Sequence, residues 1–238
     1  MLLLYSAAGY AGGYEITGNV SLTGGYSSSG FAPFYVASNR HGVLTQAKDA
    51  LAGVSLKDSL DRKKRFDFAW EVEGYAGISN SVDYLKWNPA TSSLSGINPQ
   101  RPASIFLQQL YAEVKWRSIM LSVGMKSRGS RLVDDALSGG DLVWSGNARG
   151  IPEVRIGFVD FQPIPFTRGG LEIDACLSYG KFIDTDWINN HFSFGNGKIN
   201  PGGCWTYKRL YLQTKPSLPL SARFGFQMTG IFGGHTYT

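Results

Sequence analysis

The feature that most constrains the fold is a strict alternation of apolar and polar residues over two long stretches. In residues 15–26, Ile16, Val20 and Leu22 share one parity, and Glu, Thr, Asn and Ser occupy the other. The same period of two runs through residues 65–79. Successive side chains of a β-strand point to opposite faces, so both stretches predict two-faced strands. Strands in soluble proteins usually have about 5 or 6 residues, so these are unusually long.

Shorter runs of the same alternation continue along the chain, so that about nine strands are predicted in all. A tilted strand crosses a bilayer with about 9 to 11 residues, and several runs reach that length. Phe66, Trp70 and Trp116 lie near strand ends, as an interfacial aromatic girdle requires. We therefore predict an all-β fold, specifically an antiparallel transmembrane outer-membrane β-barrel. The further runs are residues 107–116, 119–126, 153–161, 171–183, 205–213 and 220–232, with a weaker one at 50–59.

Other global features fit this class. The longest apolar run, residues 2–5, is far too short for a membrane-spanning helix, so a helical membrane protein is excluded. The net charge of +5 is spread along the 238 residues. The one cluster of basic residues, at 62–65, indicates a solvent-exposed turn rather than a nucleic-acid site. Residues 1–11 are a candidate clipped signal peptide. Residues 12–238 are then expected to belong to a single β-barrel domain.

The connections alternate in length between predicted strands. Short turns at residues 60–64, 117–118, 163–168 and 215–219 alternate with long polar connections. This is the asymmetry of outer-membrane barrels, which have tight periplasmic turns and long external loops. Short and long connections stay on opposite rims only if residues 128–152 form one long excursion from the external rim. We therefore predict that residues 142–148 are not a wall strand. The long connections are residues 27–49, 80–103, 127–152 and 184–204.

Three motifs in order resemble the Wzi family of capsule-assembly proteins, particularly its Bacteroidetes forms. They are FAPFYVASNRHG at residues 31–42, QQLYAEVKW at residues 108–116 and SGGDLVWSGNARGIPEVRIG at residues 138–157. The resemblance implies an outer-membrane barrel of about 18 strands, of which this chain would be the N-terminal half. It also implies a lectin-like role in capsule assembly or attachment. Gly150 departs from the pattern, which has proline after the Asn-Ala-Arg triplet.

The same motifs hold the candidate ligand-binding residues. Proteins recognise polysaccharides with aromatic faces, amides and guanidinium groups, and the planar Arg side chain suits carboxylates. The expected partners are capsular or other surface polysaccharide, together with outer-membrane lipid and lipopolysaccharide. The alternative is structural: Asn147 and Arg149 tie the excursion to the wall. The candidate glycan-binding residues are Trp144, Asn147, Arg149 and Arg155, joined on the same rim by Asn39 and Arg40.

Catalytic chemistry has little support in the sequence. The three His residues have no ligand-like spacing, and Ser145 before Gly146 is not part of a GxSxG elbow. We therefore predict a non-enzymatic protein without metal or cofactor. Two other readings stay open, a porin-like diffusion channel with a charged lumen and an outer-membrane lipase or deacylase. Cys176 and Cys204 could be two thiols or one disulfide.

Overall fold

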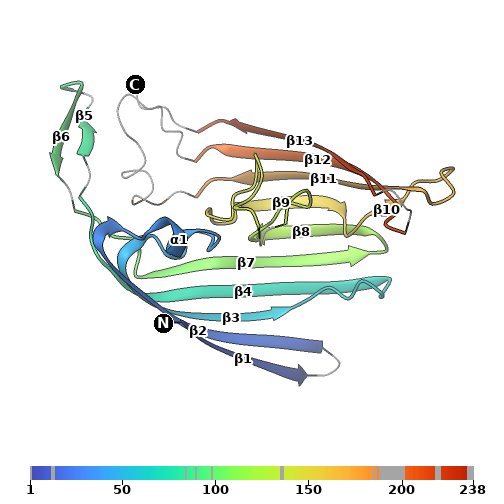
Figure 1. Ribbon diagram of the computed structural model, residues 1–238, viewed down its shortest axis with the longest axis horizontal. Coiled ribbons are helices and arrows are strands. Elements are labelled where there is room, and N and C mark those ends of the chain that lie inside the picture. The colour runs from blue at the N-terminus through green and yellow to red at the C-terminus, as the bar shows by residue number, and fades with distance from the viewer. Residues whose placement is uncertain are drawn as a thin grey trace.

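One large antiparallel sheet forms most of the protein in the computed structural model (Figure 1). The structure describes residues 2–11, 14–83, 85–88, 90–97, 99–134, 137–183, 185, 187, 202–217 and 221–234. Ten strands follow one path, β1-β2-β3-β4-β7-β8-β9-β11-β12-β13, and β10 pairs only with β11. The strands of the path are β1 (Leu2–Ala11), β2 (Tyr14–Phe31), β3 (Gln46–Asp58), β4 (Phe66–Ser79), β7 (Ile105–Trp116), β8 (Ile119–Met125), β9 (Pro152–Phe158), β11 (Leu171–Lys181), β12 (Cys204–Thr214) and β13 (Arg223–Phe232).

The all-β antiparallel class is confirmed, and each of the nine predicted stretches coincides with a strand of this path. The tenth strand is β1, which pairs with β2 from Leu2 opposite Thr23 to Ala11 opposite Tyr14. Its residues were assigned above to a candidate signal peptide, so the structure gives them a paired conformation, while cleavage stays a prediction. The path ends at β1 and β13, and closure of the sheet into a barrel also stays a prediction.

The two faces of the sheet carry different kinds of side chains. The face on which the long connections pack, here called the inner face, buries polar and charged side chains such as Glu113, Glu153, Arg155 and Asp174. The outer face exposes large apolar side chains on every strand of the path from β2 to β13. Alternation therefore places polar residues inside and apolar residues outside. Outer-face examples are Val20, Leu22, Val54, Leu56, Phe68, Val72, Leu107, Leu121, Val154, Leu177, Leu210 and Phe226.

Strand register makes the apolar outer face continuous. Leu121 on β8 lies opposite Ile156 on β9, and Ile156 lies opposite Leu177 on β11. Directly opposite residues on neighbouring antiparallel strands share a face and lie within side-chain contact distance. The three side chains are 40%, 50% and 56% exposed, so they form a row of apolar surface across three strands. A one-residue slip in register would exchange the two faces.

The connections lie on two rims, as predicted. The rim with α1 (Phe34–Ala37) carries the long connections, and the opposite rim carries short turns and β10 (Gln162–Pro163) (Figure 1). Residues 126–151 join β8 to β9, and within their described part they hold only an isolated bridge between Gly140 and Ser145. The prediction that residues 142–148 are not a wall strand is therefore confirmed. Another long connection carries a hairpin, β5 (Leu85–Asn88) and β6 (Ser93–Ile97).

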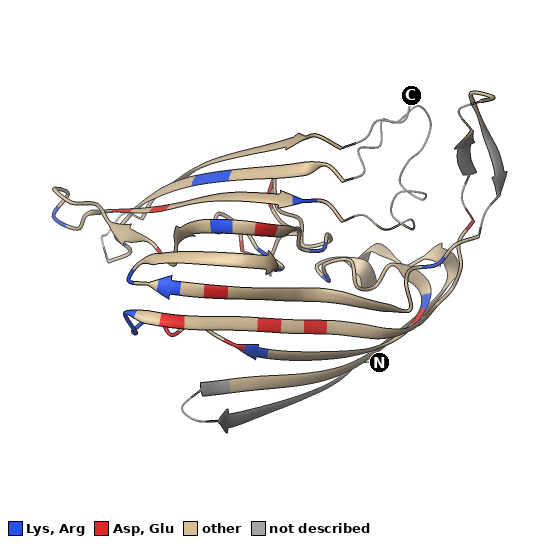
Figure 2. Ribbon diagram, turned by 180° about the vertical axis from the view of Figure 1, so that it is seen from behind, with Lys and Arg blue, Asp and Glu red and all other residues tan. Residues whose placement is uncertain are grey.

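Charged side chains mark the inner face and the turns. Figure 2 shows charged positions along β4, near the short-turn end of β7 and in the middle of β9, as well as in the short turns. Cys176 is buried, Cys204 is partly exposed, and both are free thiols. In the described part of the chain, no helix is long and apolar enough to cross a membrane.

A glycine on β8 gives a direct test of the register of this sheet. Gly124 has a φ of 120°, and a Cβ there would collide with the backbone of Leu110 and Tyr111 on β7. Gly124→Ala should therefore lower the free energy of unfolding by about 1–3 kcal/mol, measured by chemical denaturation of the purified protein. Gly25→Ala is the matched control, because a Cβ at Gly25 meets no atom within 4 Å. Equal stability of the two variants would show that β7 and β8 are not paired in this way.

Candidate functional site

A β-bulge on β7 turns two neighbouring glutamines toward the inner face. The register between β4 and β7 shifts where Glu73 pairs with Gln109 and Gly74 with Leu107, so Gln108 is the extra residue. A bulge leaves one residue unpaired and re-aims its side chain. Gln108 is 2% exposed, and its Nε2 donates to the backbone oxygen of His41 at 2.9 Å. Gln109 Nε2 donates to Glu73 at 2.7 Å, and its Oε1 accepts from the Ser127 N–H at 3.0 Å.

The β2–β3 connection, residues 32–45, bends sharply over these glutamines. Asn39 and His41 have φ values of 56° and 50°, and Gly42 follows at 72°. Non-glycine residues adopt this left-handed conformation at a cost of about 1–2 kcal/mol, so surrounding contacts must hold it. The His41 N–H donates to the Gly146 carbonyl at 2.7 Å, and the Asn39 N–H donates to Asn147 Oδ1 at 2.8 Å. The connection is therefore clamped onto the segment that joins β8 to β9.

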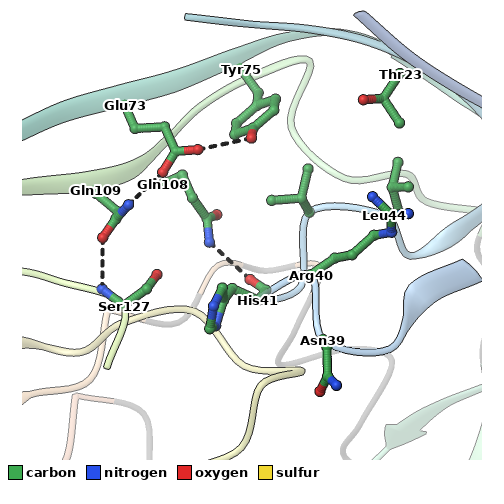
Figure 3. A pocket seen from close by; sticks show the side chains of 11 residues that line it. Thr23, Asn39, Arg40, His41, Leu44, Glu73, Tyr75, Gln108, Gln109 and Ser127 are labelled. Carbon is green, nitrogen blue, oxygen red and sulfur yellow. Dashed lines mark hydrogen bonds between the residues drawn. The ribbon is translucent and has the colours of Figure 1, made fainter. Parts of the chain in front are cut away.

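A polar cavity of about 460 Å³ lies between this connection and the sheet (Figure 3). That volume falls in the range of about 300–1,000 Å³ that small-molecule sites occupy. Its walls come from β2, β4 and β7, from the β2–β3 connection, and from Ser127 at the start of the β8–β9 connection. The lining residues are Thr23, Asn39, Arg40, His41, Val43, Leu44, Glu73, Tyr75, Gln108, Gln109 and Ser127.

The cavity contains both satisfied and unsatisfied polar groups. Glu73 accepts from the Tyr75 hydroxyl at 2.8 Å and from Gln109, so its carboxylate is well bonded. In contrast, Gln108 Oε1 and Ser127 Oγ are buried and have no hydrogen-bond partner in the described part of the chain. Buried polar groups of native proteins are nearly always bonded, so such exceptions need an explanation. A bound molecule with hydroxyl groups would supply both missing partners.

The β8–β9 connection, residues 126–151, is held on the inner face by buried charges. Arg128 pairs with Glu153 at 2.6 Å and donates to the Ser122 hydroxyl at 2.8 Å. Lys126 pairs with Glu113 at 2.8 Å, and Arg131 pairs with Asp174 at 3.1 Å. Buried charges are tolerated only when they are paired. The charged side chains of the strands and those of this connection therefore neutralise each other.

Burial and neighbouring charges shift the pKa values of groups on this connection. Burial lowers the pKa of Arg128, and repulsion from Arg155 acts in the same direction, while Glu153 opposes both. Burial alone would raise the pKa of Asp141. Hydrogen bonds from Ser130 and Gln227, with two backbone N–H groups, nevertheless bring it below the usual value of 3.8. Asp141 is thus held as a carboxylate that anchors the connection to β13.

Trp144 and Arg155 lie in a buried cluster rather than in the cavity. The Trp144 ring meets Trp205 edge-on at 5.9 Å and Tyr207 edge-on at 5.1 Å. The Arg155 guanidinium lies 5.1 Å from the Trp144 ring and pairs with Glu153. Cation–π contacts and edge-on aromatic pairs stabilise such clusters. Both residues fix the connection in place. Arg155 is 3% exposed, and Trp144, which is 8% exposed, borders a second, smaller pocket of about 100 Å³.

Arg149 supports the cavity wall from behind. Its guanidinium lies 4.0 Å above the Phe106 ring, and Phe106 stacks on Tyr75 with ring centroids 5.5 Å apart. Burial lowers the pKa of Arg149. Arg149 therefore orients Tyr75 through Phe106, which makes it a positioning residue for the cavity.

The six sequence-predicted residues are thus divided among three environments. Asn39 and Arg40 line the cavity, Asn147 and Arg149 hold its walls, and Trp144 and Arg155 are buried elsewhere. Glycan binding by any of them stays a prediction. Sequence reasoning missed Gln108, Gln109 and Ser127. The adjacent glutamines break the alternation of β7, and that break is the signal that could have revealed the bulge.

The groups that line the cavity are suited to binding a polar molecule. Within the described ranges, no group of three or more His, Cys, Asp or Glu residues could hold a metal ion. What the cavity offers is a cation, amides, hydroxyls and a bonded carboxylate. These groups recognise hydroxyl-rich and anionic molecules.

The base of the β8–β9 connection gives a test of its docked position. A Cβ at Gly150 would lie 2.5 Å from the Lys126 carbonyl oxygen, so the two ends of the connection cross where only glycine fits. Gly150→Ala should loosen the connection and increase its rate of cleavage by trypsin severalfold, because Arg128, Arg131 and Arg149 become accessible. Gly139→Ala is the control, since its Cβ would meet only Asn39 Oδ1 at 3.6 Å. Unchanged cleavage of Gly150→Ala would contradict the crossing.

Comparison of the chain with protein-family models gave no match. Comparisons with curated proteins and with solved structures gave no match either. The geometry of the faces and of the cavity is therefore the basis for assigning a function.

Proposed function

We propose that this chain forms wall strands of an outer-membrane β-barrel that binds or organises capsular or other surface polysaccharide without catalysing a reaction. The observation that carries the proposal is the inversion of the two faces. Large exposed apolar surface is unfavourable in water, whereas a barrel wall presents such a band to lipid and a polar face to its lumen. Leu121, Ile156 and Leu177 would lie against acyl chains, while Glu113 and Glu153 face the lumen.

Strand length and aromatic placement support the membrane assignment. Strands β2, β3, β4, β7, β11, β12 and β13 have 10 to 18 residues, which suffices for a tilted crossing. Phe66 lies opposite Trp116 where β4 and β7 meet the rim of short turns, and both rings are exposed. Aromatic side chains favour the boundary between lipid and water. The rim of short turns would then be periplasmic, and the cavity would open toward the cell surface.

The glycan assignment rests on the cavity chemistry and on the motif resemblance. The cavity is polar and carries unsatisfied buried groups that hydroxyls can complete. Two of the three motifs that resemble the Wzi family supply cavity residues: Asn39 and Arg40 from the first, and Gln108 and Gln109 from the second. The third motif forms the connection that clamps the cavity loop. All three motifs thus contribute to one site.

A diffusion channel is the second candidate, because the inner face is charged. Most of the charges at its centre are paired with one another, as in the Lys126–Glu113, Arg128–Glu153 and Arg209–Asp174 pairs. Two long connections also pack on this face. The paired charges and the connections that cover the inner face favour a filled lumen over an open diffusion channel.

The membrane assignment predicts that a charge on the outer face is destabilising in lipid. Ile156→Lys should lower the free energy of unfolding in phospholipid vesicles by about 2–4 kcal/mol, measured by urea titration. Leu142→Lys is the matched control, because Leu142 is fully exposed on the β8–β9 connection and outside the sheet. Wild-type protein that stays monomeric in water without detergent, together with an unaffected Ile156→Lys variant, would contradict a membrane location.

The glycan and channel functions predict different measurements on the same detergent-solubilised protein. A polysaccharide-binding protein should retain fluorescent surface glycans on a glycan array and show little ion conductance in planar bilayers. Steady conductance without glycan retention would favour the channel. Sustained hydrolysis of a glycan or lipid ester would contradict both.

A further inference from the structure

Among the described residues that line the cavity, Arg40 is the one Lys or Arg, and its side chain is exposed. Its backbone lies between two residues with positive φ, so the side chain is presented from a fixed bend. In the part of the chain that the structure describes, no carboxylate lies within 4.0 Å of its guanidinium. Most other inner-face arginines, including Arg128, Arg131, Arg155 and Arg209, are paired. Arg40 therefore has an unused capacity for an anion.

The carboxylate inside the cavity does not compete for Arg40. Glu73 is bonded by Tyr75 and Gln109, and Arg40 interacts electrostatically with the Tyr75 side chain. Figure 3 shows Arg40 extending toward Thr23 and Leu44, on the side of the view away from Gln109 and Glu73. The Arg40 guanidinium and the amide groups of Gln108 and Gln109 would thus contact different parts of a ligand in the cavity.

The deep wall has its own unused groups. Only 2% of Gln108 is exposed, and its Oε1 is an acceptor without a donor among the described residues. Ser127 Oγ is buried and also unpartnered within that part of the chain, although the Ser127 N–H is bonded to Gln109. Leaving a buried polar group without a hydrogen-bond partner is unfavourable, so these atoms gain from a ligand that pairs with them. Both residues line the cavity, so a ligand hydroxyl that enters between them can donate to Gln108 and exchange a hydrogen bond with Ser127.

We propose that the cavity binds one acidic sugar residue of a polysaccharide, with the sugar carboxylate on Arg40 and sugar hydroxyls on Gln108 and Ser127. The inference rests on the proposed function, because it names the class of glycan that the same site selects. A planar guanidinium binds a carboxylate through two parallel hydrogen bonds, which a neutral sugar cannot reproduce. The cavity volume of about 460 Å³ accommodates a single small polar molecule rather than a long chain segment.

The test uses the full chain in detergent and three pairs of probes. The acidic probes are oligosaccharides of galacturonate, glucuronate and mannuronate, and each neutral probe is the carboxyl-reduced counterpart. Wild-type protein should bind at least one acidic probe about tenfold more tightly than its neutral counterpart, as expected for a charge-assisted hydrogen bond. Arg40→Gln should remove this preference, and Arg40→Lys should retain part of it. Arg168→Gln, on the opposite rim, is the control and should leave it unchanged.

A second variant tests the deep wall without disturbing the fold. Ser127→Ala removes a hydroxyl that bonds to no described residue and keeps the backbone N–H that bonds to Gln109. It should leave the unfolding midpoint unchanged and weaken the acidic and neutral members of a pair by the same factor, about three- to tenfold. Loss of binding with a lowered unfolding midpoint would assign Ser127 a structural role and contradict its place in the site.

The failure of this inference is distinguishable from failure of the proposed function. Equal affinity for acidic and neutral probes, with no effect of Arg40→Gln, would overturn the acidic-sugar assignment while leaving glycan binding intact. Retention only of neutral glycans on an array would have the same meaning. Absence of retention of every acidic and neutral glycan by protein that is folded by circular dichroism would overturn both.

Discussion

The structure depends on neutralising the charges that the sheet turns toward its inner face. Glu113, Glu153 and Arg155 are at least 95% buried on strands whose outer face is apolar. Moving a charge from water into a protein interior costs several kcal/mol unless it is paired and hydrogen-bonded. The strands supply only part of that pairing, so the β8–β9 connection must bring Lys126 and Arg128 to the carboxylates. The connection thus neutralises charges that the sheet buries, and its docked position brings the cavity walls together.

This coupling orders the rest of the inner face. Once residues 126–151 are anchored by Arg128 and Asp141, the Gly146 carbonyl and Asn147 Oδ1 become fixed acceptors for the β2–β3 connection. That connection then adopts its left-handed bend and presents Arg40. Each connection is thus held by contacts with the part of the inner face that is already in place. Removing the anchor would therefore disturb the cavity without any change to a cavity residue.

Alternation in the sequence was sufficient to predict the strands and their polarity, because period two follows directly from strand geometry. The spacing of long and short connections was also enough to predict that residues 142–148 lie outside the strands of the sheet. The bulge at Gln108 was missed, because the adjacent glutamines interrupt the alternation at a single point and the pattern resumes on both sides. Strand β1 was assigned to an export signal because small and apolar residues serve either role. Contacts between connections 99 to 108 residues apart, as at Asn39, have no local signature.

Residue type alone could not separate binding groups from structural groups at this site. An inward polar face uses Trp, Asn and Arg both for holding its own connections and for contacting a ligand, so Trp144 and Arg155 resemble Arg40 in composition. What distinguishes them is unused hydrogen-bonding capacity. The Arg155 guanidinium is paired with Glu153 and packs against two aromatic rings. In contrast, Gln108 and Ser127 retain buried atoms without partners among the described residues. Unpartnered buried atoms also occur away from the cavity, as at Trp205 Nε1 and the Tyr207 hydroxyl. Such atoms point to a binding site where they border a cavity that also carries an exposed cation, as Gln108 and Ser127 do beside Arg40.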